Sequence, residues 1–465
     1  MAYYFKCSLN KPALSFNCGE TIRFEVYGQD RCRNIDCKYI RWELKTDDGK
    51  DEKGLGSCTA NSPLVIETTL QKPGFVHLIC KAVNDNNGID GGWEQLDAGA
   101  GAEVEKLEYH DTLPDDYCEY WAGIEKLVAD TEPEVLLCQE IPNPKDGFKA
   151  YDMRIKTPEG RPASFVLTIP DDGKKHPVRA TYMGYGVNPA TPIYNDGLIT
   201  AYFNSHGIEN CVAGIVVKEK YKDEIAEGYG FNDEENKSNM TTYFRGMMIR
   251  DLMGAKYLKT LENWDGENFI VAGGSQGALQ ATIVAAHMKG ATLLDISIPW
   301  FCDLGAGRYG FMRGWRPSFN EGLRYFDTVS HAGFIKCPVK ITAGLGDYIC
   351  PPSGVMALYN GIKTLKSIVF TQALTHGYAP NIRENVGLNY DPQNPAGELK
   401  LGKYRHFKGN EYEVLGVAVN CETLEETVIY KALYGEGKIW IRPRYEFQDF
   451  VWRDNRVMKR FEYIG

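Results

Sequence analysis

The sequence predicts an α/β fold, in which a mostly parallel sheet is covered by helices on both faces and has a β-rich domain on either side. Three observations predict it. Apolar strands alternate with helical stretches over residues 113–388, short alternating strands fill residues 1–110, and short strands return over residues 398–465. A chain of 465 residues also exceeds one ordinary core, so that two or three domains are expected.

The first segment, residues 1–110, is predicted to be an immunoglobulin-like β-sandwich. Trp42 in a central strand and the Pro73-Gly74 pair before the last strand resemble that type of domain. A spacer or a wall beside the next domain is the favoured interpretation, and sugar recognition by exposed aromatic side chains is the alternative. The predicted period-two strands cover residues 21–26, 39–44, 64–67 and 75–80.

The second segment, residues 113–388, alternates buried strands with helices of apolar periodicity, which is typical of a parallel sheet with helical crossovers. Active sites in such sheets lie at the carboxyl ends of the strands. The predicted strands cover residues 179–183, 198–203, 269–272, 339–343 and 368–370, and the predicted helices cover residues 244–261, 278–288 and 354–365.

The third segment, residues 398–465, follows Asn394-Pro395-Ala396-Gly397 and is predicted to be a small β-rich domain. Its predicted strands cover residues 411–415, 427–430 and 438–441.

Composition excludes several classes of function. The formal charge of −10 argues against nucleic acid and membrane surfaces as partners, because both require clustered Lys and Arg. The chain starts without a secretion signal and contains no apolar run long enough to span a bilayer, so we expect a cytoplasmic protein. Its thirteen cysteines are then free thiols. Their spacing is not that of zinc knuckles, and neither a metal nor a cofactor is expected.

The pentapeptide Gly273-Gly274-Ser275-Gln276-Gly277 lies between an apolar run and a helix-forming run, which is the pattern of a nucleophile elbow. Its serine must adopt a strained backbone conformation, and the glycines remove collisions with the strand and the helix. The pattern predicts a serine hydrolase with Ser275 as its nucleophile. The alternative is a glycine-rich turn that binds an anion at a helix N-terminus.

A serine nucleophile needs a base, and in the α/β-hydrolase arrangement the histidine follows the nucleophile and the acid. Four histidines follow the elbow. His287 lies in the helix directly after it, His331 precedes the best acid candidate, and His406 belongs to the terminal segment. His376 remains, in the loop after the strand at 368–370, and is the predicted base; a loop histidine with a structural role is the alternative.

The predicted acid is Asp347, which follows the strand at 341–343 through the turn Gly344-Leu345-Gly346. Its task is to hold the imidazole in the correct tautomer and to stabilise its charged form. Asp295 and Asp303 compete for this role, but Asp295 lies in an apolar run and Asp303 in an aromatic loop.

Two backbone donors are also expected where negative charge develops on the carbonyl oxygen. One is the amide of Gln276, directly after the nucleophile, and the other is predicted in Met183-Gly184-Tyr185-Gly186, at the Tyr185 amide. A simple glycine turn is the alternative for this loop.

Several motifs follow one another in the second segment: residues 117–121, Gly184-Tyr185-Gly186, Arg245-Gly246 with Asp251, the elbow, and Asp347 to Pro352 followed by Tyr359-Asn360 and His376. With these motifs the segment resembles the family 7 carbohydrate esterases, the acetylxylan esterase and cephalosporin C deacetylase group of the α/β-hydrolase superfamily. The resemblance implies removal of acetyl groups from short acetylated saccharides through an acyl-enzyme. It assigns Ser275 as nucleophile, His376 as base, Asp347 as its orienting acid, and Tyr185 and Gln276 as the oxyanion hole.

The chain departs from that family at the substrate pocket. Met183 stands where the family has His, and Asn204-Ser205-His206-Gly207 replaces its Arg-Gly-Gln loop. Met183, His206, Trp300 and Phe301 are the predicted substrate contacts. The family also forms hexamers, but the stretch between the nucleophile and the acid is shorter here, so that a homo-oligomer remains an open alternative.

The runs at residues 402–409, 422–425, 432–435 and 440–443 give the third segment its character. Through them it resembles a small bacterial domain of unknown function, from which no chemistry follows. Two alternatives to a saccharide deacetylase stay open: a serine hydrolase of other specificity on the same fold, such as a peptidase or thioesterase, and an inactive saccharide-binding scaffold.

Overall fold

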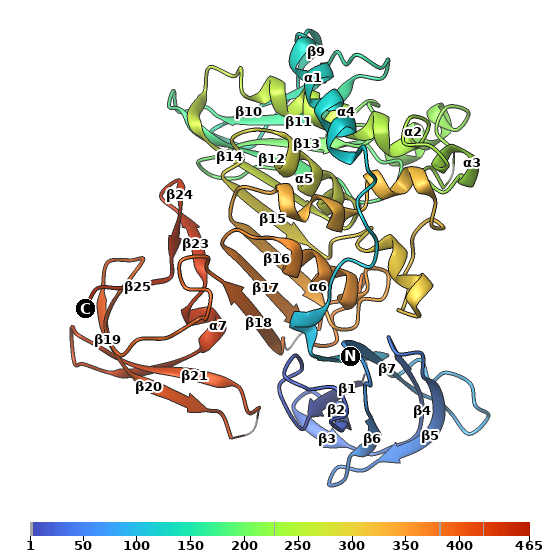
Figure 1. Cartoon of the computed structure of the whole chain (residues 1–465), viewed down its shortest axis with the longest axis vertical. Coiled ribbons are helices and arrows are strands. Elements are labelled where there is room, and N and C mark those ends of the chain that lie inside the picture. The colour runs from blue at the N-terminus through green and yellow to red at the C-terminus, as the bar shows by residue number, and fades with distance from the viewer. Residues whose placement is uncertain (1–2, 227, 381–382, 422) are drawn as a thin grey trace.

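The computed structural model describes residues 3–226, 228–380, 383–421 and 423–465. The parts of the predicted domain ranges at 1–2, 227, 381–382 and 422 lie outside the described residues. Figure 1 shows the chain as a large central sheet with helices, a β-rich N-terminal body in blue and a β-rich C-terminal body in red.

The N-terminal body is a β-sandwich of two antiparallel sheets, as predicted. Alternate residues of its strands are buried between the sheets, among them Phe24, Ile40 and Leu78, none of which is exposed to solvent. One sheet contains β1 (Tyr4–Leu9), β2 (Ile22–Asp30), β3 (Arg33–Ile35) and β6 (Leu64–Thr68), and the other contains β4 (Cys37–Thr46), β5 (Asp51–Cys58), β7 (Gly74–Ala82) and β8 (Leu96–Ala102).

The central sheet has ten strands among the described residues, in the order β18-β17-β16-β15-β14-β12-β13-β11-β10-β9. Pairing is parallel from β13 through β12 to β17 and antiparallel at both ends of the sheet. The strands are β9 (Val135–Glu140), β10 (Phe148–Ile155), β11 (Ala163–Pro170), β12 (His176–Tyr182), β13 (Ile199–Asn204), β14 (Trp264–Gly274), β15 (Leu293–Ser297), β16 (Val339–Gly344), β17 (Lys366–Thr371) and β18 (Asn385–Tyr390).

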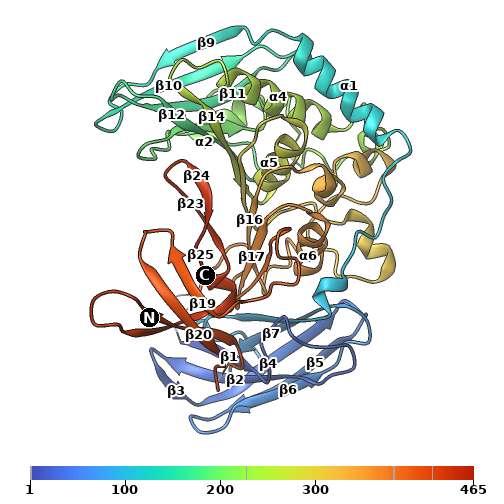
Figure 2. The ribbon, with the colours of Figure 1, turned by 60° about the vertical axis from the view of Figure 1, so that its left-hand side comes forward.

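The long helices pack on one face of this sheet (Figure 2). Helix α4 contacts α1 and α5, and both α5 and α6 contact η4, so these helices form one continuous layer. The helical segments are η1 (Val104–Lys106), α1 (Tyr117–Asp130), α2 (Gly214–Tyr221), α3 (Asp233–Asn236), α4 (Tyr243–Leu258), α5 (Gln276–His287), η2 (Leu304–Tyr309), η3 (Glu321–Tyr325), η4 (Thr328–Phe334), α6 (Pro352–Gly361) and α7 (Arg444–Phe447).

The C-terminal body forms a sheet in the order β22-β21-β20-β19-β25 and a separate hairpin of β23 and β24. Its core contains Val414, Val428, Phe447 and Phe461. Its strands are β19 (Gly402–His406), β20 (Glu411–Val419), β21 (Glu426–Ala432), β22 (Ile439–Pro443), β23 (Phe450–Arg453), β24 (Arg456–Lys459) and β25 (Phe461–Tyr463).

The hairpin β23–β24 packs on the face of the central sheet opposite to the long helices. Side chains alternate along β14, so Phe269 and Val271 point into the helical layer while Ile270 joins Phe450 of the hairpin in a second cluster with Leu293. The second face is covered in part by the C-terminal body, whose aromatic side chains bury the apolar residues there.

No helix within the described residues is long and apolar enough to cross a membrane. The thirteen cysteines, all of them described, carry free thiols.

Phe450 offers a test of the contact between the hairpin and the sheet, because only 2% of it is exposed. Phe450→Ala leaves a cavity against Ile270 and Leu293, and we expect a loss of about 3 kcal/mol in the free energy of unfolding, measured by urea denaturation. Ile441→Ala, at a position 71% exposed on β22, is the control and should change stability by less than about 0.5 kcal/mol. Equal stability of the two variants would contradict the packing described.

Candidate active site

Ser275 occupies a tight turn between the end of β14 and the start of α5. Its backbone lies at φ 54° and ψ −123°, a region that only a strongly constrained non-glycine residue adopts. The turn is held because the Ser275 N–H donates to the Ser297 carbonyl at 3.0 Å. Gly277 must lack a side chain, since a Cβ there would lie 2.0 Å from the carbonyl oxygen of Tyr182. The strand, turn and helix predicted from the pentapeptide are all present.

Asp347 and His376 contact each other at the carboxyl ends of the neighbouring strands β16 and β17. Asp347 Oδ2 lies 2.9 Å from His376 Nδ1, and Oδ1 accepts hydrogen bonds from the amides of Ile349 and Cys350, each at 3.0 Å. Asp347 is only 1% exposed, whereas the His376 side chain is 24% exposed. A carboxylate fixed in this way can orient an imidazole and stabilise its charged form.

Cys350 lies beside this pair, with its Sγ 3.8 Å from His376 Nδ1. Because β14, β15, β16 and β17 run parallel to one another, the segments that carry Ser275, Cys350 and His376 follow strands that end at the same edge of the sheet.

Asp347, Cys350 and His376 are also the one group of potential metal ligands found among the described residues. Burial raises the pKa of the Cys350 thiol well above its ordinary value, and metal binding requires the thiolate. Both oxygens of Asp347 already accept hydrogen bonds or contact His376. This arrangement suits an orienting acid better than a metal ligand.

The competing acids and histidines have other partners. Asp295 forms an ion pair with Arg179 at 2.8 Å, and Asp303 lies 2.6 Å from His110. His287, the last residue of α5, contacts His331, with their ring nitrogens 3.0 Å apart.

Tyr229 connects the elbow to the loop that carries Tyr185. Its hydroxyl donates to Gln276 Oε1 at 2.9 Å and accepts from the Gly186 N–H at 2.9 Å. Its ring stacks on that of Tyr185, with centroids 4.4 Å apart. The Gln276 side chain is fully buried. Through its two hydrogen bonds, the Tyr229 hydroxyl therefore connects the two segments that are predicted to carry the oxyanion donors. Sequence reasoning missed Tyr229; its position between Gly228 and Gly230 was the only available signal.

His206 is fully buried behind the Tyr185 loop. Its Nδ1 lies 2.6 Å from the Tyr243 hydroxyl and its Nε2 lies 3.1 Å from the Gly186 carbonyl, so neither ring nitrogen is available to a substrate. The predicted substrate contact of His206 is not supported by this geometry. His206 instead supports the loop that carries Tyr185, through its contact with the Gly186 carbonyl.

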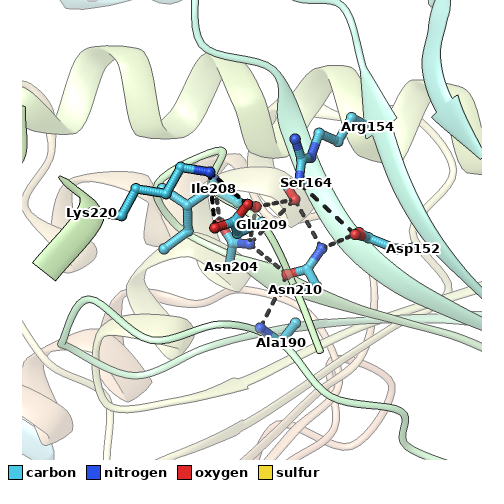
Figure 3. Close-up of polar contacts among 9 residues, drawn as sticks. All are labelled: Asp152, Arg154, Ser164, Ala190, Asn204, Ile208, Glu209, Asn210 and Lys220. Carbon is cyan, nitrogen blue, oxygen red and sulfur yellow. Dashed lines mark hydrogen bonds and ion pairs between the residues drawn. The ribbon is translucent and has the colours of Figure 1, made fainter. Parts of the chain in front are cut away.

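A buried polar network fixes the loop that carries His206 (Figure 3). Asn210 Nδ2 donates to Asp152 Oδ1 at 2.6 Å and to Ser164 Oγ at 2.9 Å, and the Ala190 N–H donates to Asn210 Oδ1 at 3.0 Å. Asn204 Nδ2 donates to Asn210 Oδ1 at 2.6 Å. These side chains connect β10, β11 and the chain after Tyr185, and their mutual hydrogen bonds offset the cost of burying them.

The three other predicted substrate contacts are Trp300, Phe301 and Met183. Trp300 packs with Tyr185 and Trp315, and these three side chains are called the aromatic wall. Trp300 is 1% exposed, donates from Nε1 to the Trp315 carbonyl at 2.6 Å, and has its backbone N–H 3.3 Å from the Ser275 carbonyl. Phe301 faces Phe244 of α4 and belongs to the core, which does not support a substrate contact. Met183 is half-buried.

Trp315 is the exposed member of this aromatic wall, with 43% of its surface accessible. Its ring packs on Tyr185 at 4.7 Å and on Phe231 at 4.8 Å. An aromatic surface of this kind can bound the space for an acyl group.

A cavity of about 460 Å³ borders His376. Polar residues such as Ser297 and Thr371 and apolar residues such as Val369 and Leu374 line it. None of the three aromatic residues Tyr185, Trp300 and Trp315 is among its lining residues.

The burial of His206 predicts a pH dependence of stability. Desolvation lowers the pKa of His206 to about 3, so the unfolded chain binds a proton below pH 6.5 that the folded chain rejects. The stability contributed by neutral His206 is present above pH 6.5 and is lost as the pH falls. Relative to His206→Gln, the wild type should lose about 2 kcal/mol of unfolding free energy between pH 7 and pH 5. Chemical denaturation at both pH values measures this difference, and a constant difference would contradict it.

Comparison with known proteins agrees with the fold and with the motifs. The family described as acetyl xylan esterase (AXE1) matches residues 101–306 and 317–393, and residues 402–463 match a protein family of unknown function, DUF1653. An acetyl esterase, Axe7A of Xylanibacter ruminicola, is 26% identical in an alignment of 332 residues that covers 66% of this chain and 72% of that protein.

Solved structures show the same fold. Acetyl xylan esterase 1 from Thermoanaerobacterium sp. JW/SL YS485 is 20% identical, with a TM-score of 0.50, over 60% of this chain and 94% of that one. The acetyl xylan esterase from Paenibacillus sp. R4 is 18% identical, with the same TM-score and coverage. The resemblance found in the sequence is therefore confirmed for both segments. The chain belongs to the acetyl xylan esterase family and is a carboxylic ester hydrolase with an α/β-hydrolase core.

Proposed function

We propose that this protein removes acetyl groups from short acetylated saccharides, with Ser275 as nucleophile, His376 as general base and Asp347 as its orienting acid. The observation that carries the proposal is the 2.9 Å contact between Asp347 and His376 beside the strained Ser275 turn. Membership of the acetyl xylan esterase family supports the acyl group and the class of substrate.

Asp347 determines which nitrogen of His376 serves the reaction. Because its Oδ2 faces Nδ1, that nitrogen carries the proton and Nε2 is left as the base. Nε2 takes the proton of Ser275 Oγ as the oxygen attacks the acetyl carbon. The imidazolium that forms is stabilised by the buried carboxylate.

The negative charge that develops on the carbonyl oxygen is stabilised by hydrogen bonds that the backbone N–H groups of Gln276 and Tyr185 donate to it. Collapse of the tetrahedral intermediate breaks the bond to the sugar oxygen, which takes the proton from His376 Nε2. Water then repeats the sequence on the acetyl-serine and releases acetate. Tyr229 contributes by holding the two amide-bearing segments at a fixed separation.

The two sides of the ester have different surroundings. The aromatic wall of Trp300, Trp315 and Tyr185 limits the acyl side, which favours acetyl over longer chains. The alcohol leaves from the side of His376, where the cavity of about 460 Å³ offers room for a sugar ring.

Ser275→Ala tests the nucleophile. We expect the rate of p-nitrophenyl acetate hydrolysis to fall by roughly 10⁴-fold or more, since the other triad members cannot act without the serine. Circular dichroism and the melting temperature should be unchanged, because the alanine keeps the turn. Turnover at the wild-type rate would refute the assignment.

Trp315→Ala tests the limit on the acyl group. The wild type should hydrolyse p-nitrophenyl acetate at least about tenfold faster than the butyrate, and the smaller side chain should reduce that ratio. Trp440→Ala is the matched control, because Trp440 is 50% exposed on the C-terminal body. If Trp315→Ala kept the wild-type ratio of acetate to butyrate hydrolysis, a residue other than Trp315 would limit the length of the acyl group. A wild type that hydrolyses long acyl esters faster than acetate would favour another serine-hydrolase specificity.

Acetate release from acetylated xylo-oligosaccharides, acetylated monosaccharides and cephalosporin C, measured side by side, then identifies the alcohol. Release from none of them would contradict the proposed saccharide substrate.

A further inference from the structure

The N-terminal sandwich lies against the two loops that follow β16 and β17, which carry Asp347 and His376. Figure 1 shows this body beside α6 and the lower end of the central sheet. The strands involved are β7 and β8, which come from a part of the chain more than two hundred residues before the loops. Backbone atoms and buried polar side chains make several of these contacts, and Phe75 of β7 adds an aromatic contact with Phe370 of β17.

The acid loop touches β8 through its backbone. A Cβ at Gly99 would lie 2.4 Å from the Leu345 carbonyl oxygen, and a Cβ at Gly346 would lie 2.3 Å from the Asp97 carbonyl oxygen. Glycine at both positions allows the two chains to approach this closely. Residues 345 and 346 directly precede Asp347, so β8 limits where the carboxylate can lie.

His77 of β7 fixes the residue on the other side of Asp347. Its ring stacks on Tyr348 with centroids 3.7 Å apart and planes inclined by 10°. The His77 ring is itself held by Asp97 of β8, whose Oδ1 lies 2.9 Å from Nε2. His77 is only 6% exposed and Asp97 only 9% exposed, so that the stack rests on a buried pair.

The base loop is held by the same strand. Gln372 Oε1 accepts from the Gly99 N–H at 2.9 Å, and its Nε2 donates to the Gly99 carbonyl at 2.9 Å. On the far side of His376, the Tyr378 hydroxyl donates to Glu94 Oε2 at 2.7 Å. His376 therefore lies between two residues that are anchored in the sandwich.

We propose that the N-terminal sandwich is a part of the catalytic unit, in which His77 and Gln372 act as positioning residues that hold Asp347 and His376 at hydrogen-bonding distance. The inference rests on the proposed roles of Asp347 and His376. It assigns a function to a domain whose likeness to immunoglobulin folds alone suggests only a spacer. The two loops are also hydrogen-bonded to each other, from the Leu345 N–H to the Thr371 carbonyl and from the Gly346 N–H to the Leu374 carbonyl, so the sandwich acts on both together.

His77→Ala removes the stack on Tyr348 and tests this inference in the full-length protein. We expect kcat for p-nitrophenyl acetate to fall about tenfold with KM unchanged, because a small displacement of the acid affects the chemical step and not binding. His77→Phe keeps an aromatic ring over Tyr348 and should recover most of kcat. Gln372→Leu, which cannot bond to Gly99, should lower kcat in the same way.

A double variant with Asp347→Asn distinguishes an effect of His77 on the position of Asp347 from an effect of His77 on overall stability. In an Asp347→Asn background, His77→Ala should lower kcat by less than about twofold, because the interaction through which it acts has already been lost. Ile66→Val is the control: Ile66 is 5% exposed in the other sheet of the sandwich, and this variant should leave kcat unchanged.

Two results would overturn the inference alone: kcat unchanged in both His77→Ala and Gln372→Leu, or an equal loss from His77→Ala with and without Asp347→Asn. If Asp347→Asn by itself kept the full kcat, the proposed triad would fall, and the inference with it. The single variant Asp347→Asn therefore distinguishes the two failures.

Discussion

The conformation of Ser275 is the constraint on which the rest of the structure depends. A serine at φ 54° is held by its hydrogen bond to the Ser297 carbonyl, at a place where β12 and α5 approach so closely that Gly277 has no room for a side chain. The same approach brings the Gln276 amide to the end of the sheet and buries its side chain, which Tyr229 then bonds to the Tyr185 loop. The proposed nucleophile and oxyanion donors are consequences of one tight turn.

The other two domains compensate for what the central sheet lacks. Its long helices form a layer on one face, and the hairpin β23–β24 places Phe450 on the apolar residues of the other. At the carboxyl edge, the loops that carry Asp347 and His376 contact β7 and β8 of the N-terminal sandwich through Tyr348 and Gln372. A core that performs the chemistry is thus completed by β-structure from both ends of the chain.

The local part of this arrangement could be predicted from the sequence. The elbow, the alternation of strands and helices, and the order of nucleophile, acid and histidine depend on residues close in the chain or on a fixed topology. Tyr229, His77 and Gln372 could not be found, because each acts through a contact with a distant segment. His206 was interpreted as a substrate contact, since nothing in Asn204-Ser205-His206-Gly207 reveals that Tyr243 and Gly186 occupy both nitrogens.

The most direct test of the central claim is the site of covalent labelling by a fluorophosphonate, which reacts only with an activated serine. Mass spectrometry of the digested, labelled protein should find one equivalent of the phosphonyl group on the peptide that contains Ser275, and the label should be absent from His376→Ala. Labelling at another residue, or labelling of Ser275 that persists fully in His376→Ala, would contradict the account.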